Sequence, residues 1–228
     1  YNKKFEINFK KLFNNILSKI SLIIIANPNS PTGTILDQKK IFKIIDKAKK
    51  YNVPVLIDEA YNGFYKPSYL KYIKKFQNLL ILRTFSKSFG LAGLRVGFLA
   101  ANNKLIKEIS KYKPMYEINS IACKVVNFLI KNKSISSKYI KDTQIGKKYF
   151  KKELAKLKIS SLKTYANFIH IGLGNQKRKI ETALKKNKIL TRKGPGVVGY
   201  ENYLRITLGP IREMKKVIQI LKRYAGNI

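Results

Sequence analysis

One lysine in this chain is surrounded by residue types that could hold a phosphate. Lys87 lies in the segment TFSKSFGLAGLRVGF, residues 84–98, where Thr84, Ser86 and Arg95 can donate hydrogen bonds to an anion and glycines leave room for a ligand. A lysine amine can form a Schiff base with a carbonyl compound. The segment therefore predicts an amine presented to a phosphate-bearing aldehyde. The alternative is that Lys87 is an ordinary lysine and that the glycines mark a turn.

Two more polar motifs precede this segment, and each follows an apolar stretch. Residues 22–26 are apolar and lead into NPNSPTGT, residues 27–34, whose prolines and glycine are typical of a loop. Residues 53–57 are also apolar and lead into Asp58, with Tyr61 shortly after it. Both apolar stretches have the length of buried strands. Each motif therefore begins where a strand is expected to end.

The lysine segment, placed behind these two motifs, resembles the lysine motif of fold-type-I pyridoxal-phosphate enzymes. It is most similar to the histidinol-phosphate aminotransferase branch of the class I/II aminotransferases, through the pattern S-K-x-x-G-L-x-G-x-R-x-G. The resemblance implies pyridoxal 5'-phosphate as the cofactor and Lys87 as the catalytic residue that carries it and moves the proton. It implies Thr84, Ser86 and Arg95 as donors to the phosphate, and no metal ion.

The same resemblance gives roles to the two upstream motifs. Asp58 lies against the ring nitrogen and keeps it protonated, which the cofactor needs in order to act as an electron sink. The Tyr61 hydroxyl contacts the phenolic oxygen. The family loop usually reads NPNNPTG, in which the asparagine before PTG also bonds that oxygen, whereas this chain has Ser30 there. Ser30 is therefore a cofactor-binding candidate with a shorter side chain, and Asn29 is a second candidate for the contact.

Two arginines near the C-terminus are candidates for binding substrate. Arginine is scarce in this chain, and lysine cannot replace it where an anion is recognised by a planar, bidentate group. The resemblance implies that Arg205, in YLRITLG, clamps a substrate carboxylate and that Arg192, in TRKGPG, helps to hold a substrate phosphate. It places Tyr116 near the substrate side chain. The alternative for Arg205 is an ordinary strand residue, and the alternative for Arg192 is a surface residue beside a Gly-Pro turn. The alternative for Tyr116 is an aromatic ring in the core.

Three further reactive residue types are expected to be structural. His170 is the only histidine and has apolar neighbours, which favours a packed or surface position over a catalytic one. Glu59 is expected only to pair with a neighbouring cation. Cys123 is the single cysteine, which excludes an internal disulfide and agrees with a reducing cytoplasm, the expected location.

The net charge of +36 would ordinarily suggest a nucleic acid or an anionic membrane as partner. The lysines are spread along a predicted helix face, however, as at Lys39, Lys43 and Lys47, and they accompany abundant isoleucine and asparagine. This composition is typical of drift in an AT-rich genome, so no specific nucleic-acid partner is expected. No apolar run is long enough to span a membrane, and the first residues do not read as a secretion signal.

Apolar strands that alternate with helices predict an α/β chain. The fold expected from the resemblance is a three-layer αβα large domain of the PLP-dependent transferase type, incomplete at its N-terminus, followed by a smaller C-terminal α/β domain. The predicted domains are residues 1–130 and 131–228. A mostly helical stretch is expected over 102–157. Strands are predicted over 22–26, 53–57, 79–82, 166–172, 189–191 and 203–208, and helices over 37–51, over 176–187 and at the end of the chain.

The sequence thus predicts a pyridoxal-phosphate aminotransferase that moves an amino group between an amino acid or amino phosphate ester and a 2-oxo acid, and that is a homodimer when full length. Family members are longer, so we expect a chain truncated at its N-terminus whose activity alone is in doubt. Three alternatives remain open: a decarboxylase of an O-phosphorylated amino acid on the same scaffold, an inactive fragment, and a basic nucleic-acid-binding protein.

Overall fold

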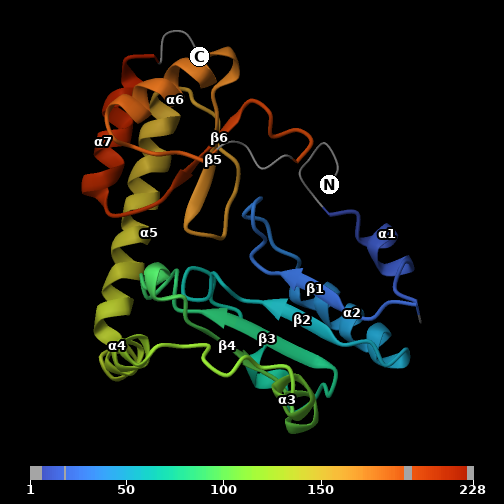
Figure 1. The fold of residues 1–228 in the computed structure, drawn as a ribbon. Helices are drawn as coiled ribbons and strands as arrows, with labels where there is room; N and C mark the ends of the chain where they lie inside the picture. Colours follow the sequence, from blue (N-terminus) through green and yellow to red (C-terminus); the bar gives the residue numbers. More distant parts are fainter. Residues whose placement is uncertain (1–6, 18, 193–196, 225–228) are drawn as a thin grey trace. The chain divides into compact units, whose positions relative to one another are not determined.

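The computed structural model describes residues 7–17, 19–192 and 197–224 of the chain (Figure 1). These residues divide into two compact units. Unit 1 comprises residues 1–30 and 35–136, and unit 2 comprises residues 31–34 and 137–228. Each unit has its own sheet and its own hydrophobic core.

Unit 1 is built on a sheet of four strands in sequence order: β1 (Ile23–Ala26), β2 (Val55–Asp58), β3 (Leu79–Thr84) and β4 (Gly97–Ala100). The first three strands are parallel, and β4 is antiparallel to β3. Asp58, the last residue of β2, pairs with Ala26 and with Leu82. The three parallel strands, side by side in Figure 1, therefore end at the same edge of the sheet.

Helix α2 (Gln38–Lys50) covers one face of this sheet. It begins after Asp37, whose carboxylate accepts a hydrogen bond of 2.9 Å from the Lys40 N–H and so caps the first turn. It ends at Lys50, with Tyr51 as the C-cap, and the helix predicted over 37–51 is confirmed. The buried side chains of the helix and the alternate residues of the strands form the core of unit 1: Ile41, Ile44, Ile45 and Ala48 with Ile25, Val55, Ile57, Leu79 and Ile81.

Helix α4 (Ser120–Lys131) supports the lysine segment. The Asn119 side chain caps the helix by accepting a hydrogen bond of 2.8 Å from the Ala122 N–H. One face of α4 forms a small core with the lysine segment, made of Ala122 and Val126 with Phe85 and Val96. Unit 1 also contains α1 (Phe9–Asn14), α3 (Asn103–Ser110) and the single 3-10 turns η1 (Leu70–Tyr72) and η2 (Ala92–Leu94).

Unit 2 pairs β5 (Phe168–Gly172) with β6 (Tyr203–Thr207) in an antiparallel sheet. Its helices are α5 (Lys133–Lys156, from residue 137 onward), α6 (Lys177–Lys186) and α7 (Ile211–Lys222), with the short turn η3 (Gly174–Gln176) before α6. All of these helices contribute to the core around the sheet, whose most deeply buried members include Phe150, Ile169, Ile180, Leu184, Leu204 and Leu221.

One predicted strand does not form. Residues 189–191 are irregular, and only Arg192 makes an isolated antiparallel bridge, to Arg205. The chain leaves α6 through Lys188, whose φ of 58° lies in the left-handed region. Strand β4 was not predicted, because it begins at Gly97 inside a pattern that indicates a turn.

The compact units divide the chain close to the predicted domain boundary, and the domains 1–130 and 131–228 stay a prediction. The predicted boundary after residue 130 falls near the end of α4, whereas the units divide after residue 136, inside the continuous helix α5. Residues 31–34 also belong to unit 2, where the Gly33 carbonyl accepts a hydrogen bond of 2.8 Å from the Tyr165 N–H. Both features depend on long-range packing that local sequence patterns do not contain.

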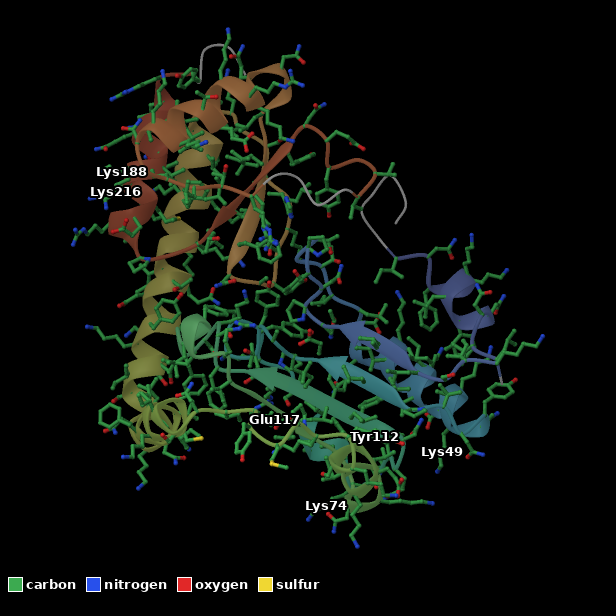
Figure 2. All side chains as sticks on the ribbon, viewed as in Figure 1. Lys49, Lys74, Tyr112, Glu117, Lys188 and Lys216 are labelled. Carbon is green, nitrogen blue, oxygen red and sulfur yellow. The ribbon has the colours of Figure 1, made fainter. Side chains whose placement is uncertain are left out.

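Basic side chains project from separate elements of the chain. Figure 2 labels Lys49 on α2, Lys74 after η1, Lys188 after α6 and Lys216 on α7, and all four are exposed. These lysines therefore belong to elements of both units, and a compositional origin of the charge stays a prediction. In the part of the chain that the structure describes, no helix has both the length and the apolar character required to cross a membrane.

Candidate active site

The amine and the aromatic ring predicted for the cofactor site lie together in unit 1. The Nζ atom of Lys87 is 5.8 Å from the centroid of the Tyr61 ring, within cation–π range, and Tyr61 is buried. Lys87 belongs to the turn after β3, and Tyr61 belongs to the loop after β2. Because these neighbouring strands are parallel, the segments that follow them leave from the same edge of the sheet, where the sequence placed the site.

Asp58 ends β2 at this edge and is half-buried. Its Oδ1 atom accepts a hydrogen bond of 2.8 Å from the Ala60 N–H, while Oδ2 has no hydrogen-bond partner within the described residues. Burial raises the pKa of Asp58; the Ala60 N–H opposes this rise and the charge of Glu59 adds to it. A carboxylate with a spare oxygen in such a place is suited to bind a protonated ring nitrogen, whose charge would stabilise the ionised form. The residues present therefore fit the pyridine end of the implied cofactor.

The predicted phosphate donors form one turn. The Thr84 hydroxyl accepts a hydrogen bond of 3.0 Å from the Ser86 N–H and donates one of 3.4 Å to the Val96 carbonyl. Thr84 thus shapes the turn that carries Ser86 and Lys87, both of them half-buried. Direct contact of Thr84 or Ser86 with a phosphate stays a prediction.

Arg95 is held in an unusual backbone conformation. Its φ of 56° and ψ of 41° lie in the left-handed region, which costs a non-glycine residue about 1 to 2 kcal/mol. The side chain is exposed, and its Nη1 atom donates a hydrogen bond of 2.9 Å to the Ala92 carbonyl. Within the described residues its other guanidinium N–H groups make no further hydrogen bond, so they can donate to an anion.

The glycines of the lysine segment divide into two kinds. A Cβ atom at Gly97 would lie 2.6 Å from the carbonyl oxygen of Arg83, so this glycine permits the close pairing of β3 and β4 rather than the approach of a ligand. At Gly90 and Gly93 a Cβ would meet nothing within 4 Å, which leaves open space at both positions.

Asn27, which sequence reasoning did not single out, fixes the loop after β1. It is 2% exposed; its N–H donates a hydrogen bond of 2.9 Å to the Asp58 carbonyl, and its Oδ1 accepts one of 2.9 Å from the Leu36 N–H. The Asn27–Pro28 peptide bond is cis. Of the two candidates that follow, Asn29 is half-buried and Ser30 is exposed, and their contact with a phenolic oxygen stays a prediction.

The two substrate-binding candidates of unit 2 lie on adjacent backbone. Arg205, on β6, forms the isolated bridge with Arg192, so their main chains are neighbours. The guanidinium carbon of Arg205 is 4.7 Å from the Phe168 ring centroid, an arrangement that orients its planar group. Arg192 is exposed. The Lys-Gly-Pro-Gly sequence after it, residues 193–196, lies outside the described residues.

Tyr116 is 93% exposed, in the segment between α3 and α4. Its neighbours Tyr112 and Met115 are exposed by 87% and 85%, and Figure 2 labels Tyr112 and Glu117 in this segment. The ring is therefore not a core residue, which was the alternative. Its role beside a substrate stays a prediction.

Two polar residues that were expected to be structural are buried. Glu59 is 2% exposed and pairs with Arg83 on β3, which extends the simple ion pair expected of it. His170 is fully buried on β5 and bonds the Pro31 carbonyl. In the sequence, only the position of Glu59 next to Asp58 and the position of His170 within an apolar strand indicated that these two side chains would be buried.

A parallel sheet with a carboxylate at the end of β2 and a lysine turn after β3 is the arrangement of a fold-type-I pyridoxal-phosphate enzyme. The chain matches the family "Aminotransferase class I and II" over residues 1–221 and belongs to that family. It is 37% identical over 200 residues to histidinol-phosphate aminotransferase 1 of Carboxydothermus hydrogenoformans, covering 88% of this chain and 56% of the relative. It is 36% identical to the histidinol-phosphate aminotransferase of Clostridium novyi, covering 97% of this chain and 61% of the relative.

Solved structures agree with this assignment. The histidinol-phosphate aminotransferase of Clostridium acetobutylicum superposes with a TM-score of 0.86 at 26% identity, over 100% of this chain and 70% of the other. L-threonine-O-3-phosphate decarboxylase of Porphyromonas gingivalis, at 21% identity and a TM-score of 0.77 over 94% of this chain and 69% of the other, shares the fold. The chain spans 56% and 61% of the length of the two curated relatives above. The predicted fold class and family are confirmed, and family membership supports pyridoxal 5'-phosphate as the cofactor.

Proposed function

We propose that the whole protein carrying this chain is a pyridoxal-phosphate-dependent aminotransferase of the histidinol-phosphate type. It exchanges an amino group between an amino acid or an amino phosphate ester and a 2-oxo acid. The family, and two relatives of that name at 37% and 36% identity, support the proposal. The observation that carries it is the position of the Lys87 amine, 5.8 Å from the ring of Tyr61 at the strand edge where Asp58 ends β2.

Each residue has a role that follows from its chemistry. When bound, pyridoxal 5'-phosphate supplies an electron sink that makes a substrate α-hydrogen easier to remove. Lys87 holds the cofactor and then, as a neutral amine, accepts the α-proton at Nζ and gives it up again. Asp58 holds the ring nitrogen, Tyr61, Ser30 and Asn29 are candidates for the phenolic oxygen, and Ser86 and Arg95 bind the phosphate while Thr84 shapes their turn.

Other residues than these cofactor-binding ones recognise the substrate. Arg205 holds the anionic group of the substrate through its planar guanidinium, and Arg192 holds a second anionic group such as a phosphate. Tyr116 is proposed to border the substrate side chain. The support is the adjacency of the two arginines across the bridge and the orientation of Arg205 against Phe168.

The test uses the whole protein, expressed from its native gene and purified with the cofactor. Borohydride reduction followed by peptide mass spectrometry is expected to find the cofactor on Lys87, and amino transfer is expected from histidinol phosphate to a 2-oxo acid. Lys87→Ala removes both, whereas Lys74→Ala, at an exposed lysine of the same unit, retains both. Cofactor attached elsewhere, or no transfer to any 2-oxo acid, would overturn the proposal.

The same protein distinguishes the competing functions. Carbon dioxide released from O-phosphoserine or O-phosphothreonine, without amino transfer, would identify the decarboxylase. Retention on DNA that falls steeply with salt, without any visible absorbance from the cofactor, would identify a nucleic-acid-binding protein. The decarboxylase shares only the fold with this chain, so aminotransfer is the function supported best.

We also propose that the whole protein acts as a homodimer in the cytoplasm. The exposure of large apolar side chains on α4, 69% for Ile121 and 56% for Phe128, supports a further interface, and a single cysteine suits a reducing compartment. Light scattering after size exclusion is expected to give twice the mass of one chain, and fractionation of the source cells is expected to place the protein in the cytoplasm. A monomer at micromolar concentration would contradict the first statement, and recovery outside the cytoplasm would contradict the second.

A further inference from the structure

Glu59 is the centre of a closed polar cluster in unit 1. The side chain is 2% exposed, and a charge in such a place needs both a partner and hydrogen bonds. Its Oε2 atom lies 2.9 Å from both Nε and Nη2 of Arg83 and accepts a hydrogen bond of 2.9 Å from the Ser68 hydroxyl. Its Oε1 atom accepts one of 2.5 Å from the Tyr69 N–H.

The cluster closes on itself through Ser68. While its hydroxyl donates to Glu59, Ser68 accepts a hydrogen bond of 2.6 Å from Nη2 of Arg83. The guanidinium of Arg83 therefore contacts both the carboxylate and the serine that bonds it. Such a closed arrangement fixes the separation of the backbone segments that carry the three side chains.

Those segments are the ones that carry the proposed cofactor residues. Glu59 directly follows Asp58, Ser68 belongs to the loop that begins at Tyr61, and Arg83 directly precedes Thr84. The backbone joins the same two segments, because the Glu59 N–H donates a hydrogen bond of 2.8 Å to the Leu82 carbonyl. The cluster thus ties the carboxylate side of the site to the lysine side.

The cluster also sets the charge beside Asp58. Glu59 is the like charge next to that carboxylate, and it adds to the rise in the pKa of Asp58 that burial causes. Arg83 carries the compensating positive charge. Other charged or titratable groups on the surrounding segments are Tyr61, Tyr65, Lys66 and Tyr69 in the loop and Lys87 in the lysine turn, and β1 carries none.

We propose that Glu59 and Arg83 are positioning residues of the cofactor site, which hold Asp58 and the Lys87 turn at a fixed separation and balance the charge next to Asp58. This inference rests on the proposed function. It assigns to the pair a role beyond stabilising the fold, because the two partners carry opposite charges on residues next to Asp58 and next to its strand partner Leu82.

The test compares Glu59→Gln, Arg83→Met and the double variant in the whole protein. Each single substitution is expected to weaken cofactor binding at neutral pH by about tenfold or more, as removal of a group that orients a direct contact does. The double variant is expected to be less impaired than the product of the two singles, because the partners act as a unit. Arg83→Lys, which keeps the charge but not the fork, and Ser68→Ala give milder variants that are expected to fold and to bind more weakly than the unsubstituted protein.

The decisive measurement is the pH profile of the cofactor dissociation constant. Binding is expected to weaken on the acid side as Asp58 takes up a proton. Arg83→Met leaves Glu59 uncompensated and moves this loss to higher pH, whereas Glu59→Gln leaves Arg83 uncompensated and moves it to lower pH. A purely structural pair would not shift the profile in opposite directions.

Two controls separate stability from positioning. Ile41→Val, in the fully buried core of the same unit, lowers the unfolding temperature without touching the cluster, and Glu108→Gln breaks the exposed 2.7 Å pair with Lys111. Both are expected to bind the cofactor as the unsubstituted protein does. If the cluster variants bind like Ile41→Val, or if both profiles move in one direction, the positioning role is refuted while the function stands. Failure of the unsubstituted protein to bind the cofactor overturns both.

Discussion

The Nε2 atom of His170 lies 2.8 Å from the carbonyl oxygen of Pro31, although the two residues are 139 positions apart in the chain. A carbonyl only accepts, so Nε2 carries the proton, and Nδ1 is buried without a hydrogen-bond partner among the described residues. Both residues belong to unit 2. His170 therefore holds the second half of the NPNSPTGT loop against β5, directly after the cofactor candidates Asn29 and Ser30.

The burial of His170 makes unit 2 sensitive to acid. Burial lowers the pKa of His170; the Pro31 carbonyl opposes this fall and the charge of Arg205 adds to it. The folded state therefore stays neutral where the unfolded state, with a pKa of about 6.5, takes up a proton. The stability is fully present above about pH 6.5 and is lost as the pH falls from there toward the lowered value.

Urea unfolding between about pH 8 and about pH 5 measures this loss. His170→Leu is expected to flatten the pH dependence and to lower stability at neutral pH by about 1 to 3 kcal/mol, because the Pro31 carbonyl loses its donor. An unchanged slope in His170→Leu would show that other groups cause the acid sensitivity.

The Gly33 position tests how tightly the loop is packed. Gly33 has a φ of 77°, and a Cβ there would lie 2.4 Å from the Thr164 hydroxyl oxygen. Gly33→Ala is expected to lower the unfolding free energy of unit 2 by about 2 to 4 kcal/mol, from backbone strain and overpacking together. Gly174→Ala is the matched control, because Gly174 has a φ of 48° but meets nothing within 4 Å. Equal losses in the two variants, measured by chemical denaturation, would mean that the loop yields to the added methyl group.

Replacing Arg205 by lysine is expected to impair substrate binding, although the positive charge is kept. Its guanidinium lies over the Phe168 ring at 4.7 Å, and an ammonium group cannot reproduce either this stacking or a bidentate bond. Arg205→Lys should lower kcat/KM for histidinol phosphate by about 10- to 100-fold, which corresponds to about 1.4 to 2.8 kcal/mol of lost charged hydrogen bonding. Cofactor affinity should not change.

Arg178→Lys, on the exposed surface of α6, is the control for the loss of a guanidinium in unit 2. Steady-state kinetics of both variants with histidinol phosphate measure the change in kcat/KM. A normal kcat/KM in Arg205→Lys would remove this residue from the substrate site.

Elements defined by local chemistry could be predicted from the sequence. Helix α2 carries its own signals, with Asp37 as N-cap and isoleucines at helical spacing, and the three parallel strands are short apolar runs that end in polar motifs. Family resemblance then identified Lys87, Tyr61 and Asp58, which lie along one edge of the sheet as expected.

Features that depend on distant partners could not be predicted. The Glu59–Arg83 pair joins residues on different strands, and only the sheet register brings them together. The same limit explains the error at residues 189–191, where an apolar, β-branched run resembled a strand but only Arg192 reaches a partner. The glycines of the lysine segment, Gly97 among them, were expected to leave room for a ligand, because the sequence does not show that antiparallel pairing of β3 with β4 brings the Arg83 carbonyl against Gly97.

Substitution of Arg95 can change cofactor affinity and the free energy of unfolding in opposite directions. Its left-handed backbone is strained for arginine, so Arg95→Gly is expected to raise the unfolding free energy by about 0.5 to 1 kcal/mol while removing a charged donor to the phosphate. Cofactor affinity should fall by about 10- to 100-fold. The matched control is Lys158→Gly, at an exposed lysine with the same φ of 56°, which should gain similar stability with unchanged affinity. Because a destabilised site and a lost contact normally weaken binding together, a more stable variant that binds more weakly points to the phosphate contact itself. Cofactor titration and thermal unfolding of both variants provide the measurement, and equal affinity in both would exclude Arg95 from the phosphate site.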